Sequence, residues 1–157
     1  MGTMKEIRHP IRMSSFGKRD MRAQFAALPW RRRNGKIEVL LVTTRDTGRW
    51  VIPKGWPMNG KTPAEVAATE AFEEAGVIGV PADQCLGIFT YTKILEDGEL
   101  PVVAVVYPVE VTRLLSDWDE KPCRKRKWVA LKKAAKTVSD IELAELLSDP
   151  ALQKRLI

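Results

Sequence analysis

Strand signals dominate the pattern of apolar and polar positions along this chain. Asn34-Gly35 and Asp97-Gly98 each separate two such signals, and both pairs suit the positive φ angles of hairpin turns. The β-branched run 102–106 predicts a strand that is buried on both faces of a sheet. Strands are expected over 24–30, 37–44, 86–95, 100–111 and 127–130, with a further short strand inside 45–54.

One helix is predicted in the middle of the chain and two near its end. The segment 62–65, Thr-Pro-Ala-Glu, has the form of a capping box with proline at the first helical position. Gly76 is placed to end that helix. The later helices are expected at 131–137 and 141–147. Strands, one helix, more strands and then helices predict an α/β fold, with a mixed sheet covered by helices on both sides.

Three glutamates of the central helix form a group: at about 100° per residue, Glu70, Glu73 and Glu74 share one narrow arc. We therefore expect the carboxylates to point away from the core as a cluster. Like charges this close repel, and a hard cation such as Mg²⁺ or Mn²⁺ would relieve the repulsion. The alternative is an ordinary solvated acidic helix face. The expected apolar stripe on the opposite side consists of Ala64, Ala68, Ala71, Phe72 and Ala75.

The segment 50–77 resembles the signature of the Nudix hydrolase family, G-x5-E-x7-R-E-U-x-E-E-x-G-U, where U is a bulky apolar residue. Two positions depart from it, because Lys61 stands in place of the first Glu and Thr69 in place of the Arg. R-W-V-I-P-K-G before the helix and R-K-R-K-W-V after Cys123 are similar to the diphosphoinositol polyphosphate phosphohydrolase branch. The resemblance covers roughly residues 20 to 137 and implies an α/β/α sandwich. The matching positions are Gly55, Glu70, Glu73, Glu74, Gly76 and Val77.

This resemblance implies a metal-dependent hydrolase that cleaves a diphosphate linkage. Glu70 and Glu74 would ligate Mg²⁺ or Mn²⁺, and Glu73 would be the general base for the attacking water. The expected substrate is an inositol pyrophosphate, a dinucleoside polyphosphate or a related nucleoside diphosphate derivative.

Basic residues and one glycine are the candidates for substrate binding. Gly55 would let the backbone approach the helix and the metal. Lys54 would contact a phosphate or be merely exposed. Alternation along a strand sends Arg124 and Arg126 to one face, which we expect to be the substrate's. The alternative is that this run is a solvated edge strand. Arg45 is added by the resemblance.

The composition of the 157 residues suits one globular domain, expected over 21–157 after an N-terminal arm at 1–20. The net charge of +6 favours an anionic, phosphorylated small molecule, with nucleic acid as a less favoured partner. The longest apolar run is too short to span a membrane. Two widely separated cysteines and the lack of an apolar leader indicate a cytoplasmic protein.

The two departures from the signature suggest a coupled replacement, because losing only one member of an opposite-charge pair would strand the other. Lys61 also brings a positive charge close to the expected metal site. The competing hypothesis is therefore a degenerate Nudix domain, which binds a phosphorylated ligand or nucleic acid without cleaving it.

Overall fold

The computed structural model of the chain describes residues 5–7 and 22–156. Most of the expected arm lies outside these residues; the part within them forms strand β1 (Lys5–Ile7), which pairs with β7. The other strands are β2 (Arg22–Arg33), β3 (Lys36–Thr43), β4 (Trp50–Val51), β5 (Lys54–Gly55), β6 (Val77–Pro81), β7 (Gly87–Leu95), β8 (Gly98–Leu114) and β9 (Arg126–Ala130). The helices are α1 (Pro63–Ala75), α2 (Leu131–Thr137), α3 (Ile141–Ser148) and α4 (Pro150–Arg155), with a 3-10 turn at Lys121–Cys123.

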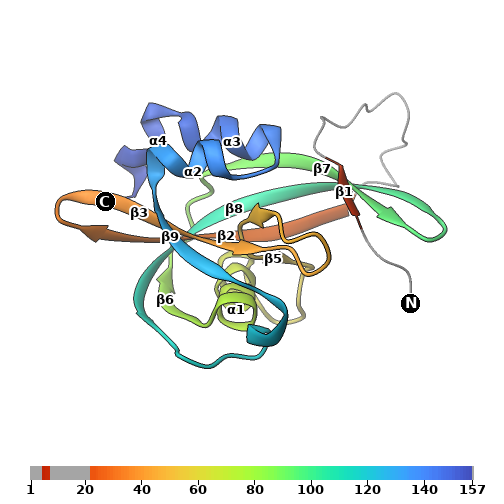
Figure 1. Cartoon of the computed structure of the whole chain (residues 1–157), viewed down its shortest axis with the longest axis horizontal. Coiled ribbons are helices and arrows are strands. Elements are labelled where there is room, and N and C mark those ends of the chain that lie inside the picture. Colours follow the sequence, from red (N-terminus) through yellow and green to blue (C-terminus); the bar gives the residue numbers. More distant parts are fainter. Residues whose placement is uncertain (1–4, 8–21, 157) are drawn as a thin grey trace.

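The strands form one mixed sheet between two helical layers. Its order is β1-β7-β8-β2-β3-β4, with β5 added to β2, β6 to β8 and β9 to β3. The β2–β8 pair is parallel and the other pairs are antiparallel. Figure 1 shows α1 on one side of the sheet and α2, α3 and α4 on the other. The predicted α/β sandwich is confirmed. Among the described residues, no helix is long and apolar enough to cross a membrane.

Both hairpins form at the predicted turns, but the strands run further than the sequence indicated. Asn34 and Gly35 have φ angles of 52° and 74°. Strand β2 continues to Arg33, which pairs with Lys36, so the basic residues before the turn are strand residues. Strand β6 and helix α4 were not predicted.

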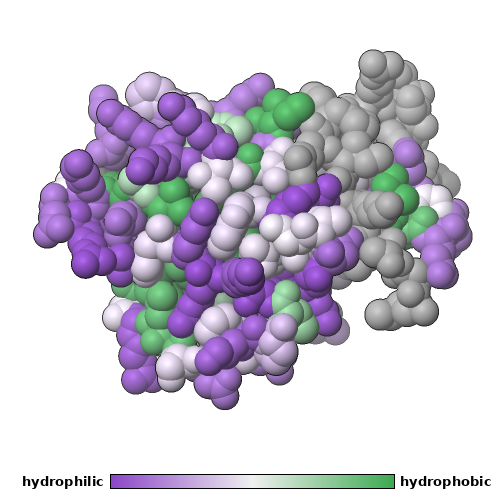
Figure 2. Space-filling model, in the orientation of Figure 1, coloured by the Kyte–Doolittle hydropathy of each residue, from purple (hydrophilic) through white to green (hydrophobic). Residues whose placement is uncertain are grey.

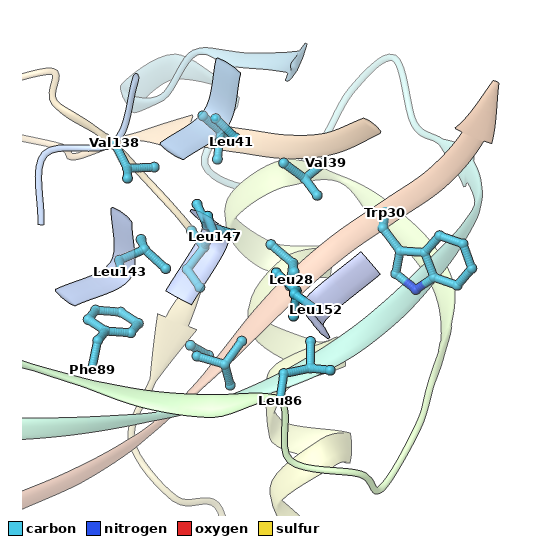
Figure 3. Packing of buried hydrophobic residues seen from close by; sticks show 14 of the residues in the cluster. Leu28, Trp30, Val39, Leu41, Leu86, Phe89, Val138, Leu143, Leu147 and Leu152 are labelled. Carbon is cyan, nitrogen blue, oxygen red and sulfur yellow. The ribbon is translucent and has the colours of Figure 1, made fainter. Parts of the chain in front are cut away.

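The sheet has a hydrophobic core on each face because β3 sends alternate side chains to opposite sides. Figure 3 shows Val39 and Leu41 in the core beneath the C-terminal helices, together with Phe89, Leu143 and Leu147. The other core lies under α1 and contains Leu40, Val42, Ala67, Ala71 and Ala75.

Helix α1 begins and ends as its sequence predicts. Thr62 Oγ1 accepts a 3.2 Å hydrogen bond from the amide of Glu65, whose carboxylate accepts a 2.8 Å bond from the amide of Thr62. Gly76 ends the helix with a φ of 65°. A Cβ at this glycine would lie 2.8 Å from Arg126 Nη1 and 3.1 Å from Trp118 Cβ.

Replacing Gly76 by alanine is expected to destabilise the protein more than replacing Gly60. Both glycines have positive φ, which costs a residue with a Cβ about 1–2 kcal/mol, but a Cβ at Gly60 meets nothing within 4 Å. The difference in unfolding free energy between Gly76→Ala and Gly60→Ala, measured by urea denaturation, gives the cost of the clash of the new Cβ with Arg126 and Trp118. Equal losses of unfolding free energy would contradict this account of the helix end.

Candidate active site

Helix α1 buries two of the three glutamates that were expected to cluster. Glu70 is 9% exposed and Glu74 is 6% exposed, while Glu73 is half-buried. All three were expected to point away from the core; Glu70 and Glu74 are nevertheless buried, because other segments cover this side of the helix. Phe72, expected in the apolar stripe, is 45% exposed instead. The pattern misled because α1 is covered by β5 and by the chain between β8 and β9 as well as by the sheet.

The backbone of Gly55 lies against the carboxylate of Glu70. A Cβ at this position would fall 2.1 Å from Glu70 Oε1, which is far inside contact distance. Only glycine therefore lets β5 approach α1 this closely. The expected close approach of the backbone at Gly55 to the helix is present, while its approach to a metal stays a prediction.

The two buried carboxyls both hold protons more tightly than usual. Burial raises the pKa of Glu74 to about 8, against the lowering effect of Arg124 and Lys54. Burial also raises the pKa of Glu70, and the nearby charges of Glu73 and Glu120 add to this effect. The pair is thus short of positive charge, which is the condition that attracts a cation.

Arg124 joins this pair to two other segments. Its Nη2 lies 3.6 Å from Glu74 Oε1, and its Nε donates a 2.7 Å hydrogen bond to Glu120 Oε1. Its Nη1 donates to the carbonyl of Thr43 at the end of β3. The side chain is only 12% exposed, so these charges interact with little screening by water.

Arg126 reaches the same side of the sheet as Arg124, as strand alternation predicts, but its donors serve the backbone. Nη1 donates to the carbonyl of Ala75 at 2.7 Å, and Nη2 donates to that of Leu115 at 2.6 Å. Its guanidinium also stacks on the ring of Trp118, 3.9 Å from the centroid. These contacts give Arg126 a structural role at the end of α1, so a contact with substrate stays a prediction.

The other two cations predicted to bind substrate differ in exposure: Lys54 is partly buried and Arg45 is exposed. Lys54, on β5, has its Nζ 5.0 Å from the ring centroid of Tyr91, and its charge lowers the pKa of Glu74. Arg45 is exposed in the loop after β3, with Nη2 4.0 Å from Cys123 Sγ. The structure therefore places Lys54 at the carboxyl pair and Arg45 beside the segment that leads into Arg124.

Sequence reasoning missed the segment that closes over the end of α1. The amide of Glu120 donates to the carbonyl of Glu73 at 3.2 Å, and Trp118 Nε1 donates to that of Glu74 at 2.9 Å. The only available signal was a tryptophan within the acidic stretch 117–120, which has no regular period. Such contacts depend on where a loop folds back onto the helix, and the pattern of neighbouring residues in the sequence does not predict this.

The two residues that depart from the family signature contact each other. Lys61 Nζ donates a 2.8 Å hydrogen bond to Thr69 Oγ1, which in turn donates to the carbonyl of Glu65 at 2.9 Å. The loop before α1 is thereby tied to the helix one residue before Glu70. A hydrogen bond between these two residues thus takes the place of an ion pair.

A hard divalent cation fits this donor set. Within residues 22–156, no group of three or more His, Cys, Asp or Glu side chains converges on one point. Glu70 and Glu74 are one turn apart on α1, and the pKa of each is raised, so both carboxyls favour a bound positive charge. Mg²⁺ is commonly held by one or two carboxylates, with water and substrate phosphates completing its shell. These two residues would hold it here.

Metal-free protein is expected to lose stability as the pH rises from about 5 to about 8. Between the ordinary value of 4.5 and the folded value of about 8, native Glu74 keeps a proton that the unfolded chain releases. The unfolding free energy then falls by up to about 1.4 kcal/mol per pH unit. Urea denaturation in chelator measures this slope, and Glu74→Gln should flatten it. A wild-type profile as flat as that of the variant would contradict the buried, protonated carboxyl.

Comparisons with known proteins find relatives of this chain. Nudix hydrolase 12, mitochondrial, of Arabidopsis thaliana is 35% identical over 103 residues, which are 63% of this chain and 51% of that protein. Human diphosphoinositol polyphosphate phosphohydrolase 3-beta is 35% identical over 104 residues, 64% of this chain and 60% of that protein. The chain thus spans about half to three fifths of the length of these relatives.

Solved structures show the same fold at lower identity. The Caenorhabditis elegans Ap4A hydrolase superposes with a TM-score of 0.57 at 22% identity, covering 81% of this chain and 93% of that one. The NUDIX domain of Shewanella oneidensis NrtR, complexed with ADP ribose, gives 0.62 at 15% identity, covering 94% of both chains. The profile of the NUDIX domain matches residues 21–149, nearly the whole described body, and the chain therefore belongs to the Nudix family.

Proposed function

We propose that this protein hydrolyses a diphosphate linkage in an anionic, phosphorylated small molecule, using Mg²⁺ or Mn²⁺ held by Glu70 and Glu74. The observation that carries the proposal is the pair of buried carboxyls packed against Gly55 and flanked by two cations. Nudix hydrolases generally use divalent metal ions. Such an ion neutralises phosphate oxygens and lowers the pKa of a bound water.

Other residues of the site supply the general base and the contacts with phosphate. Glu73 is the half-buried carboxylate beside the pair, and we assign it the role of general base because water can reach it. Lys54 and Arg124 lie beside Glu74, where they would bind phosphate oxygens as a point charge and as a planar fork. Arg45 would extend this binding at the edge of the site.

The names of related proteins support the substrate class. Relatives called diphosphoinositol polyphosphate phosphohydrolase and Ap4A hydrolase suggest an inositol pyrophosphate, a dinucleoside polyphosphate or a related nucleoside diphosphate derivative. We further propose that the reaction takes place in the cytoplasm. Two cysteines without a disulfide support this location.

A second candidate, binding without hydrolysis, is favoured by one observation. Lys61 places an ammonium group within hydrogen-bonding distance of Thr69, next to the metal-binding Glu70. A positive charge there would repel a divalent cation and so weaken its binding. A panel of inositol pyrophosphates, dinucleoside polyphosphates, nucleotide sugars and nucleoside triphosphates separates the two functions. Metal-dependent release of phosphate or monophosphate supports hydrolysis, while binding without release supports the alternative.

Glu73→Gln and Glu74→Gln are each expected to remove most turnover while leaving the fold intact. Loss of a general base lowers the reaction rate about 10²–10⁴-fold. Loss of a metal ligand removes the rate enhancement that the metal ion provides. The measurement is kcat on the best substrate of the panel, with circular dichroism as the check on folding. Glu110→Gln, an exposed carboxylate on β8, is the matched control and should keep wild-type turnover. Wild-type rates in both site variants would refute the assigned site.

A double-mutant cycle tests whether Lys61 and Thr69 act together. Lys61→Glu alone leaves a carboxylate without an arginine partner, and Thr69→Arg alone sets a second cation beside Lys61. The double variant should recover stability and kcat/KM, with an interaction energy of about 0.5–3 kcal/mol. Additivity within about 0.3 kcal/mol would show that the two positions are independent despite their contact.

A further inference from the structure

Glu120 brings a further carboxylate to the site from outside helix α1. It lies in the segment between β8 and β9, and its side chain is 19% exposed. Figure 1 shows this segment passing below α1, and Figure 2 shows hydrophilic side chains at that edge of the molecule. The charge of Glu120 raises the pKa of Glu70, so the two carboxyls are close enough to interact.

Backbone hydrogen bonds fix Glu120 between the end of α1 and the turn that follows it. Its amide donates to the carbonyl of Glu73 at 3.2 Å, and its carbonyl accepts a 2.9 Å hydrogen bond from the amide of Cys123. The second bond closes the 3-10 turn Lys121–Cys123, which Arg124 follows directly. Helix and turn together therefore set the carboxylate of Glu120 beside the guanidinium of Arg124, four residues later.

Two acceptors hold the guanidinium of Arg124 in one orientation. Nε donates to Glu120 Oε1 at 2.7 Å, and Nη1 donates to the carbonyl of Thr43 at 2.9 Å. Because the guanidinium is planar, these two bonds fix the direction of its third nitrogen. Nη2 lies 3.6 Å from Glu74 Oε1, which is longer than a hydrogen bond. Among the residues that the structure describes, Nη2 accordingly donates no hydrogen bond.

Glu120 and Glu74 compete for the same guanidinium. Arginine and a carboxylate prefer two parallel N–H···O bonds, and such a pairing with Glu74 would occupy a carboxylate that the metal ion needs. By accepting from Nε, Glu120 keeps the guanidinium turned so that only Nη2 approaches Glu74. An arginine ordered in advance also loses less conformational entropy when it binds a ligand.

We propose that Glu120 is a positioning residue, which orients Arg124 so that Nη2 meets a phosphate oxygen of the substrate and leaves Glu74 to the metal ion. This role rests on the proposed function, because it takes Arg124 as a ligand of the diphosphate. Glu120 acts through a hydrogen bond that it accepts, and it needs no contact with the substrate. Its loss therefore weakens substrate binding more than it slows the chemical step.

The first test measures, by calorimetry in Mg²⁺, the affinity for imidodiphosphate, a diphosphate analogue that resists hydrolysis. Glu120→Ala should weaken binding about tenfold, the effect expected for one hydrogen bond to a charged group. Glu120→Gln should stay within about threefold of wild type, because its amide oxygen still accepts from Nε. A glutamine variant as weak as the alanine variant would overturn the proposal. Asp119→Ala removes an exposed acidic neighbour as the matched control and should change the affinity less than about twofold.

A double-mutant cycle tests whether Glu120 acts through Arg124. Arg124→Gln removes the oriented donor, so adding Glu120→Ala to it should weaken imidodiphosphate binding by less than a further twofold or so, about the limit of such cycles. Circular dichroism checks that each variant is folded. Full additivity of the two single losses would show that Glu120 acts independently of Arg124, and the proposal would fall.

Steady-state kinetics on the best substrate of the panel gives a second readout. Glu120→Ala should raise KM with little change in kcat, and Glu120→Gln should restore KM. A large loss of kcat in Glu120→Gln would instead make this carboxylate a general base or a metal ligand, against the proposal.

The binding measurement also separates this proposal from the proposed function. Wild type that binds imidodiphosphate but cleaves no substrate of the panel refutes hydrolysis, and the binding cycle still decides the role of Glu120. Wild type that fails to bind imidodiphosphate in Mg²⁺ refutes the positioning role, whatever substrate it cleaves.

Discussion

The burial of Glu70 and Glu74 is the constraint to which the surrounding structure conforms. An isolated carboxylate taken out of water costs several kcal/mol, so a buried pair requires compensation nearby. Lys54 on β5 and Arg124 in the segment before β9 bring positive charge to the pair. Gly55 permits this packing because no other residue would leave room for the carboxylate of Glu70.

The end of α1 is fastened by groups from outside the helix. A helix leaves its last carbonyls without hydrogen-bond partners inside the helix. Here the segment between β8 and β9 and the first residue of β9 supply those partners. Trp118 and Arg126 donate to the carbonyls of Glu74 and Ala75, and the amides of Glu120 and Leu115 donate to those of Glu73 and Gly76. The guanidinium of Arg126 also sits favourably at the negative end of the helix dipole. These hydrogen bonds hold the end of α1, and the glutamates on it, in a fixed position.

The β3–β9 pair connects two chemically different ends of the molecule. At the end of β3, the carbonyl of Thr43 accepts a hydrogen bond from Arg124, which belongs to the carboxyl site. At its start, Lys36 is an exposed cation of the β2–β3 hairpin. Acidic groups are thus buried at one end, while the cations of the hairpin are exposed at the other. The net charge of +6 does not reveal this separation.

Local interactions explain what the sequence alone determined. The capping box at Thr62, the end of α1 at Gly76 and the turn at Asn34-Gly35 each depend on contacts within a few residues, so a linear pattern specifies them. The family signature likewise singled out Glu70, Glu73 and Glu74, because their spacing on one helix places them on one arc.

Tertiary structure alone decided which of these side chains are buried. A helical wheel treats the polar arc as solvent-facing, but β5 and the 115–126 segment cover that arc and enclose Glu70 and Glu74. The same folding turned Arg126 toward the backbone of Ala75 and brought Lys61 to Thr69. Contacts between segments distant in sequence depend on how the sheet is assembled, and the order of residues along one strand or helix carries no record of them.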